Sequence, residues 1–197
     1  MKMTVLFKGA LVSSAMIVAS LGSANAQACQ ETQFSSKNAE LYLKAETEFI
    51  TNGNNAGALA ALQQLRQLEL NCYEDSAAQR LAAAIKIDSG DFAGAARDIE
   101  RMLASGIIPA ADRTKTLYDI SQIYLNADNQ PKALEYLTKW IQAGGRPNRD
   151  TKWQLAVLNN KQNRNREAAR WAEEVFRDDG PNAARQVYDF LIYLYDD

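Results

Sequence analysis

The stretch LYDISQIYLNADNQPKALEYLTKW, residues 117–140, decides the fold, because it holds two amphipathic segments joined by one polar turn. Small and apolar side chains recur at helical spacing on both sides of the turn, at Leu117, Ile120, Ser121, Tyr124 and Leu125, and then at Ala133, Leu134, Leu137, Trp140 and Ile141. The residues between these stripes include Asn, Asp and Pro, which favour turns. A one-sided stripe marks a helix that buries one face. The stretch therefore predicts two antiparallel helices.

The start of the second stripe recurs along the chain, each time after a turn rich in Gly, Asn or Asp. The matching alanines are Ala58, Ala95, Ala133 and Ala168, which are separated by 37, 38 and 35 residues. A period of this length is typical of helical repeats, in which helix pairs stack because one pair cannot bury both of its faces. The alanines indicate close helix crossings, since a small side chain lets two backbones approach.

Gly and Pro residues, which interrupt helices, divide the chain after residue 35 into helical segments. No run alternates between apolar and polar residues as a strand does. We therefore expect an all-α fold. The expected helices are 36–51, 55–70, 74–88, 92–104, 110–126, 130–143, 148–161, 165–178 and 182–195.

The third helix pair places large, large, small, aromatic, alanine and large side chains at Leu117, Ile120, Ser121, Tyr124, Ala133 and Leu137. This pattern resembles the tetratricopeptide repeat (TPR). The resemblance extends over four units, at about 36–71, 74–105, 110–145 and 148–180, with a capping helix at 182–195. Lys86 and Asn159 depart from it, because an aromatic residue is usual at their positions. The resemblance implies a right-handed α-solenoid of about four helix pairs.

Longer segments are similar to those of exported bacterial TPR proteins that are described as components of TonB systems. The similar segments are 107–109, 116–124, 130–140 and the aromatic C-terminal stretch 188–195. The resemblance covers roughly residues 36–197. It implies a periplasmic protein without an enzymatic role that assists TonB-linked uptake across the outer membrane. The implied partners are TonB-type energy-coupling proteins or outer-membrane receptor components.

The first 26 residues have the order of a secretory signal peptide. Lys2 and Lys8 give a positive start, residues 10–21 form an apolar run, and residues 23–26 (Ser-Ala-Asn-Ala) supply a cleavage site. The apolar run is shorter than the roughly 20 residues that span a bilayer, although an uncleaved anchor helix is the alternative. We predict an exported, periplasmic protein without a membrane-spanning segment in its mature chain. Its parts are a tail at 27–35 and a TPR domain at 36–197.

The sequence has two cysteines, Cys29 and Cys72, and both belong to the predicted mature chain. Disulfides form in oxidising compartments outside the cytosol. We therefore predict a bond between Cys29 and Cys72 that clips the tail to the first helix pair. Two alternatives stay open: both thiols are unpaired, or Cys29 carries a lipid, because it follows small residues as in lipoproteins. Ala26 stands where such lipoprotein sites usually carry Leu.

Several function classes lack their usual residues. The chain contains no histidine, which removes Ser-His-Asp and Cys-His catalysis and most zinc sites. It has no glycine-rich phosphate motif. Removing the signal peptide takes away two lysines and no acidic residue, so the net charge changes from −2 to −4, and nucleic acid is not an expected partner. We expect no enzyme, no metal and no cofactor.

The TPR resemblance also implies a partner-binding groove, because the first helix of each unit lines the concave face in that family. Transferred to this chain, the groove residues are Arg80, Lys115, Tyr118, Gln122, Asn126, Trp153 and Asn160. Tyr, Trp and Arg side chains dominate the energy of protein interfaces. For Tyr118 and Trp153, packing between units is the alternative role. Trp140 and Trp171 belong to second helices and are interpreted as core or convex packing.

The predicted function is a non-enzymatic scaffold for protein–protein interaction that supports TonB-dependent transport. One alternative is a periplasmic assembly factor or chaperone for envelope or cell-wall machinery. Another is a homo-oligomer formed through the last helix. In that helix Phe190, Tyr193 and Leu194 are expected to pack inward, while Tyr188 and Tyr195 face outward.

Overall fold

The computed structural model describes residue 29 and residues 33–106 and 108–196. The predicted signal peptide at 1–26 lies outside these residues, as does most of the tail at 27–35. The described part of the chain is helical and contains no strand, which confirms the all-α prediction. Its helices are α1 (Ser36–Glu46), extended by a π-helical turn (Thr47–Thr51), α2 (Asn55–Leu65), α3 (Cys72–Asp88), α4 (Phe92–Ser105), α5 (Ala110–Asn126), α6 (Gln130–Gln142), α7 (Arg149–Asn160), α8 (Asn165–Asp179) and α9 (Arg185–Asp196).

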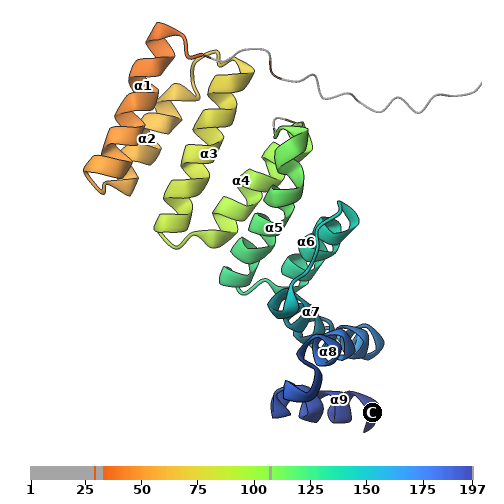
Figure 1. Cartoon of the computed structure of the whole chain (residues 1–197). Helices are drawn as coiled ribbons and strands as arrows, with labels where there is room; N and C mark the ends of the chain where they lie inside the picture. The colour runs from red at the N-terminus through yellow and green to blue at the C-terminus, as the bar shows by residue number, and fades with distance from the viewer. Residues whose placement is uncertain (1–28, 30–32, 107, 197) are drawn as a thin grey trace, which may run out of the picture.

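Consecutive helices pack against each other in four pairs, α1/α2, α3/α4, α5/α6 and α7/α8, and α9 packs on α8. Neighbouring pairs touch where α2 meets α3, α4 meets α5 and α6 meets α7. Figure 1 shows the result as a row of helices that runs from α1 to α9. Within residues 33–106 and 108–196, no helix is both long enough and apolar enough to cross a membrane.

One type of turn joins the two helices of every pair. It contains a residue with left-handed backbone, with φ of 60° at Gly53, 79° at Gly90, 54° at Asp128 and 58° at Asn163. These residues are separated by the same intervals as the four repeat alanines. Glycine reaches this conformation freely, and Asn and Asp reach it more easily than other residues do. The repeat in the sequence is therefore also a repeat of backbone conformation.

The residue after each left-handed position precedes the second helix of its pair, and in three of the four turns its side chain caps that helix. At Asn54, Asp91 and Asn129 the side-chain oxygen accepts a hydrogen bond from the backbone N–H three residues later, at 2.8 to 3.2 Å. Such caps satisfy donors that the first turn of a helix leaves unpaired. The fourth turn has Arg164 in this place, and its side chain makes no capping hydrogen bond.

Two large hydrophobic clusters form the core and meet at α3. The first packs α1, α2 and α3 around buried residues such as Leu62 and Ile85. The second runs from Ala83 on α3 to Leu158 on α7. The four repeat alanines are fully buried, which fits their predicted place at helix crossings.

The two departures from the aromatic pattern have different structural causes. Lys86 on α3 forms an ion pair with Asp98 on α4 at 2.6 Å, and the Asp98 side chain is only 2% exposed. In the next pair the corresponding positions hold Tyr124 and Tyr136, whose ring centroids are 5.8 Å apart. An ion pair thus takes the place of an aromatic pair between the two helices. Asn159 instead donates its side-chain amide to a backbone carbonyl of its own helix, α7, at 2.7 Å.

The end of α2 was predicted wrongly, because α2 stops at Leu65 rather than at residue 70. The following residues turn toward α3, and the carbonyl of Glu69 accepts a hydrogen bond from the side chain of Asn38 at 3.1 Å. Asn71 is extended and caps α3 through a capping box. These contacts hold the segment after Leu65 in a non-helical conformation. Because Asn71 is the cap of the next helix, α3 begins at Cys72.

Two expectations about the last helix were also wrong. α9 begins at Arg185 rather than at residue 182, because Gly180–Asn182 forms a 3₁₀ turn and Ala183 is extended. Tyr193 does not pack inward, since it is 52% exposed, and Val187 is buried on the inner side of the helix instead.

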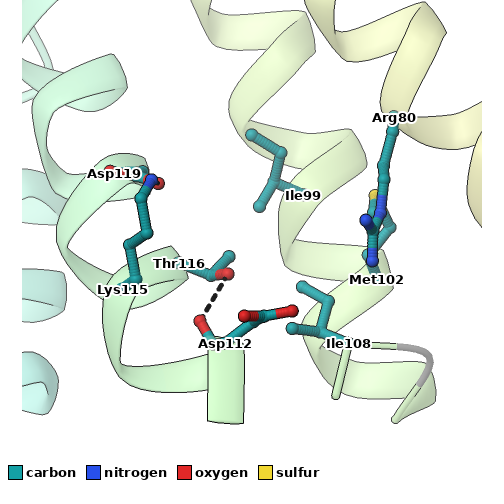
Figure 2. Close-up of a pocket in the computed structure, with 8 residues that line it drawn as sticks. All are labelled: Arg80, Ile99, Met102, Ile108, Asp112, Lys115, Thr116 and Asp119. Atoms are coloured by element: carbon teal, nitrogen blue, oxygen red, sulfur yellow. Dashed lines mark hydrogen bonds and ion pairs between the residues drawn. The ribbon is translucent and has the colours of Figure 1, made fainter. Parts of the chain in front are cut away.

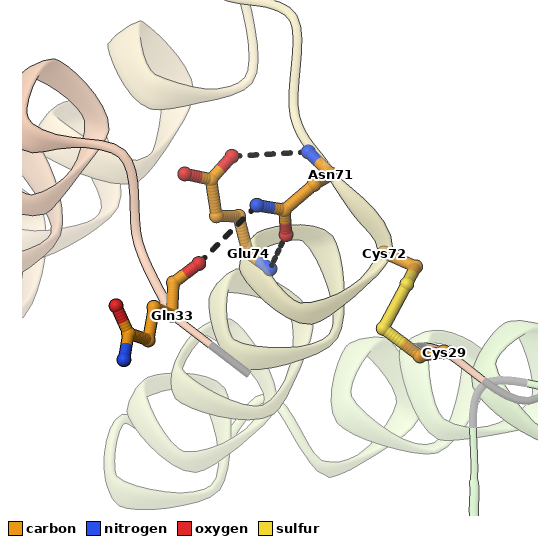
Figure 3. Close-up of a disulfide and its surroundings, with 5 residues drawn as sticks. All are labelled: Cys29, Gln33, Asn71, Cys72 and Glu74. Atoms are coloured by element: carbon orange, nitrogen blue, oxygen red, sulfur yellow. Dashed lines mark hydrogen bonds between the residues drawn. A yellow bond between two sulfur atoms is a disulfide. The ribbon is translucent and has the colours of Figure 1, made fainter. Parts of the chain in front are cut away.

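A disulfide ties the segment before α1 to the start of α3 (Figure 3). It joins Cys29 to Cys72, whose Cα atoms are 5.6 Å apart, and this confirms the predicted bond. Its expected place on the first helix pair was wrong, because Cys72 is the first residue of α3 in the second pair. Beside it, the side-chain amide of Asn71 donates a hydrogen bond to the backbone carbonyl of Gln33 at 3.3 Å. The N-terminal segment is thus attached by covalent and polar contacts at the same place.

Glu74 is a buried carboxylate next to this disulfide. It accepts hydrogen bonds from the backbone N–H of Ser35 at 2.7 Å, the side-chain amide of Asn38 at 2.8 Å and the backbone N–H of Asn71 at 3.0 Å. Burial by itself raises the pKa of the Glu74 carboxyl, but these hydrogen bonds outweigh burial and hold the pKa below its usual value of 4.5. The carboxylate therefore links α1 and α3 in its charged form.

Candidate partner-binding surface

A hollow lies between α3 and α5, the first helices of the second and third pairs, with α4 behind it (Figure 2). Its volume is about 250 Å³. It is lined by Arg80 from α3, Ile99 and Met102 from α4, Ile108 from the loop before α5, and Asp112, Lys115, Thr116 and Asp119 from α5. Met102 and Ile108 are buried, whereas Arg80, Asp112 and Lys115 are exposed. The hollow thus combines an apolar floor with a charged rim.

The charges on the rim are not all neutralised. Lys115 forms an ion pair with Asp119, one turn later on α5. Arg80 and Asp112 make no ion pair with any other residue that the structure describes, and in Figure 2 their side chains extend into the hollow from opposite walls. An arginine without an acidic partner retains its donors for a carboxylate of another molecule.

A second hollow adjoins the first, and the two share Arg80. It has a volume of about 420 Å³. Its other lining residues are Cys29, Tyr42, Tyr73, Ser76, Ala77 and Pro109. Arg80 thus separates a hollow that extends to Lys115 from one that extends to Cys29 of the disulfide.

Aromatic side chains form the wall of the second hollow. The ring of Phe34 lies between Tyr42, at a centroid distance of 4.5 Å, and Tyr73, at 5.5 Å. Burial, and then the nearby carboxylate of Glu46, raise the pKa of Tyr42 to about 12. Tyr42 is therefore neutral at physiological pH. Aromatic surface beside a free arginine is the composition that carries most binding energy at protein interfaces.

Arg80 and Lys115 are the predicted groove residues that the structure brings together in one hollow. Tyr118 lies further along α5 and is half-buried, with its ring centroid 4.9 Å from that of Trp140 on α6. Trp140 and Trp171 both pack against the larger core cluster.

Three of the remaining predicted groove residues, Trp153, Gln122 and Asn160, make contacts with other side chains. The ring of Trp153 is 5.2 Å from that of Phe190 on α9. Gln122 donates a hydrogen bond to the side chain of Gln154 on α7 at 3.4 Å. The two other members of the set differ in their surroundings: Asn160 donates to Asn165 at 3.2 Å, and Asn126 is exposed.

Sequence reasoning missed the floor of the first hollow and the aromatic wall of the second. The floor comes from α4 and from the loop before α5. The groove positions that the TPR resemblance implies belong only to the first helix of each pair. One signal was present in the sequence: Ile108 and Pro109 form an apolar stretch in a loop, and an apolar loop residue usually packs against something. Ile108 is indeed 5% exposed.

In the described part of the chain, no group of three or more His, Cys, Asp or Glu side chains is placed to hold a metal ion. No family model matches the sequence, and no curated protein matches it. The two hollows combine an apolar floor, an aromatic wall and a charged rim.

Proposed function

We propose that this chain is an exported, non-enzymatic scaffold of the TPR type, which binds a partner protein on the surface formed by its first helices. The observation that carries the proposal is the depression between α3 and α5, where Arg80 and Lys115 border an apolar floor. A preformed depression lowers the ordering cost of association.

The chemistry of the depression defines the segment that would fit it. Arg80 offers a planar set of donors that matches a carboxylate. Ile99, Met102 and Ile108 offer an apolar floor next to it. We therefore propose a partner segment that carries an acidic residue beside a large apolar one.

The proposed location and the narrower role rest on other grounds. The predicted signal peptide favours export, and a Cys29–Cys72 bond is compatible with an oxidising compartment. The resemblance to exported TPR proteins of TonB systems supports a role in TonB-dependent transport. The partner would then be an energy-coupling protein or an outer-membrane receptor component in the periplasm.

Site-specific photo-crosslinking in intact cells tests the proposal. A photoreactive residue would replace Lys115 at the hollow, or Lys139 on α6 as the matched control. Both lysines are exposed, and each forms an ion pair with an acidic residue four positions away in its own helix. Only the first of them lines the depression.

Three outcomes are distinguishable. If Lys115 captures a TonB-type or receptor protein and Lys139 does not, the proposal stands. If Lys115 captures many unrelated envelope proteins, the alternative of an assembly factor or chaperone replaces it. If only Lys139 captures a protein, the binding surface lies elsewhere and the proposal is wrong.

Substitution of Arg80 gives a second test. Arg80→Ala should strongly reduce crosslinking through Lys115, because it removes the unpaired cation. Arg166→Ala serves as the control, since Arg166 on α8 is also exposed and forms no ion pair within the described residues. Equal crosslinking by the two variants would show that Arg80 does not contribute.

A further inference from the structure

The outer side of α9 carries an exposed stripe of large apolar side chains. Val187 and Leu194 are buried against the rest of the chain, whereas Tyr188, Ile192 and Tyr195 are 41%, 59% and 64% exposed. The three exposed residues recur at i, i+4 and i+7, so they lie along one side of the helix. Exposed apolar side chains that gather on one side of a helix are a candidate interaction surface.

Both tyrosines of the stripe are held in place by α8. The ring centroid of Tyr188 lies 4.9 Å from that of Phe176, and the hydroxyl of Tyr195 donates a hydrogen bond to the carboxylate of Glu173. The rings are therefore ordered at the surface before any partner binds. Association on this stripe would cost less side-chain entropy than association on free side chains.

We propose that this stripe docks against the same stripe of a second copy of the chain, with the two α9 helices antiparallel. The stripe is approximately symmetric about Ile192, because Tyr188 lies four residues before it and Tyr195 three residues after it. A twofold axis at Ile192 places this residue against its own copy, and it places Tyr188 near the partner's Tyr195. Such a self-complementary patch is what a twofold interface requires.

The charges beside the stripe favour the same arrangement. Arg185 begins α9 and Asp196 ends it, so the exposed face has one basic and one acidic end. Antiparallel pairing brings each Arg185 near the partner's Asp196, whereas parallel pairing would place like charges together. Within the described residues, Arg185 forms an ion pair with Asp189 of its own helix at 3.5 Å. Its side chain is 92% exposed, so it can reach a new partner. The stripe and its charges thus complement their own rotated copy.

Sedimentation equilibrium of the exported chain over a range of concentrations tests the association. The apparent mass should rise toward that of two chains as the concentration increases. Ile192→Glu should return the mass to that of one chain at every concentration. Ile50→Glu, in the π-helical turn that follows α1, is the matched control. Ile50 is 74% exposed and lies at the other end of the row, so this variant should leave association unchanged.

Two further sets of variants test the orientation. Ile192→Cys alone should form a disulfide-linked dimer under mild oxidation, and a mixture of Tyr188→Cys and Tyr195→Cys should crosslink more than either variant alone. Arg185→Asp should weaken the dimer, and adding Asp196→Arg in the same chain should restore it. Circular dichroism would confirm that each variant keeps its helices.

The proposal fails if the chain keeps the mass of one copy at all concentrations. The stripe could then bind a different protein, and that outcome also counts against self-association. It also fails if Ile192→Glu and Ile50→Glu associate equally well. If Tyr188→Cys crosslinks to itself as readily as to Tyr195→Cys, or the charge exchange does not restore association, the antiparallel arrangement is wrong.

Discussion

Single side chains fix how the N-terminal segment joins the rest of the chain, and Glu74 is the most constrained of them. Replacing Glu74 by Gln keeps its size but turns one acceptor oxygen into an amide donor that faces other donors. We expect the free energy of unfolding to fall by about 1–3 kcal/mol, the usual cost of unmatched buried polar groups. Urea unfolding of Glu74→Gln measures this loss. Glu69→Gln, at an exposed position nearby, should change stability by less than about 0.5 kcal/mol, and equal losses would contradict the assignment.

The same carboxylate makes stability depend on pH. Because the pKa of Glu74 is lower in the folded chain than its usual value of 4.5, its stabilising contribution is complete above that pH. The contribution is lost as the pH falls through the lowered pKa of the folded state, where the carboxylate takes up a proton. The difference in unfolding free energy between the wild type and Glu74→Gln should therefore shrink below pH 4.5. Parallel stability curves between neutral and acidic pH would show that Glu74 is not the group responsible.

Helix ends show which local features the fold reuses and where one of them is missing. Arg164 precedes α8 with φ of −101° and ψ of 62°, close to the −97° and 74° of Asn129 before α6. Only Asn129 caps its helix, so Arg164→Asn should supply the missing cap without changing the backbone. We expect a gain of about 1 kcal/mol in the free energy of unfolding. Asn129→Ala is the matched comparison and should cause a loss of similar size, whereas a loss in both variants would show that Arg164 has another role.

The elements of this chain were predictable because their signals are local. The alanine period and the turns at Gly53 and Gly90 defined the helix pairs, and α5 and α6 lie within one residue of their predicted bounds. The end of α2 was not predictable, because no breaker stands at residue 66. There the chain after the helix is held by Asn38, which is distant in sequence and whose side-chain amide donates a hydrogen bond to the carbonyl of Glu69.

The candidate site was predictable only in part, for a related reason. Arg80 and Lys115 follow from the position of each first helix in its pair, and they do line one hollow. The period cannot show which side chains are used in packing, so it gave no sign that Tyr118 would lie against Trp140. Nor could it show that Trp153 would meet Phe190, since that contact depends on where the last helix docks.

The whole molecule is a row of helices whose contacts are mostly between neighbours in sequence. In such a row, stability is approximately a sum of local terms, and opening begins at the ends. The two described ends differ. The segment before α1 is held by the Cys29–Cys72 bond and by Glu74, whereas α9 is held by packing on α8 and by single contacts such as the one between Phe190 and Trp153.

This difference predicts an order of opening that native-state hydrogen exchange measures. Amides of α9 should exchange with the lowest opening free energy, and those of α5 and α6, inside the larger core cluster, with the highest. Replacing both cysteines, as Cys29→Ser with Cys72→Ser, removes a bond that closes 43 residues. Protection in α1 and α2 should then fall by up to about 4 kcal/mol, the chain-entropy value for a loop of this length, while protection in α9 stays the same. The experiment belongs in the Ile192→Glu background as well as in the wild type, since self-association would raise the protection of α9. If one opening free energy described all helices in both backgrounds, the row would unfold as a single cooperative unit, and the attachment at its N-terminal end would contribute to the stability of the whole chain rather than to that end alone.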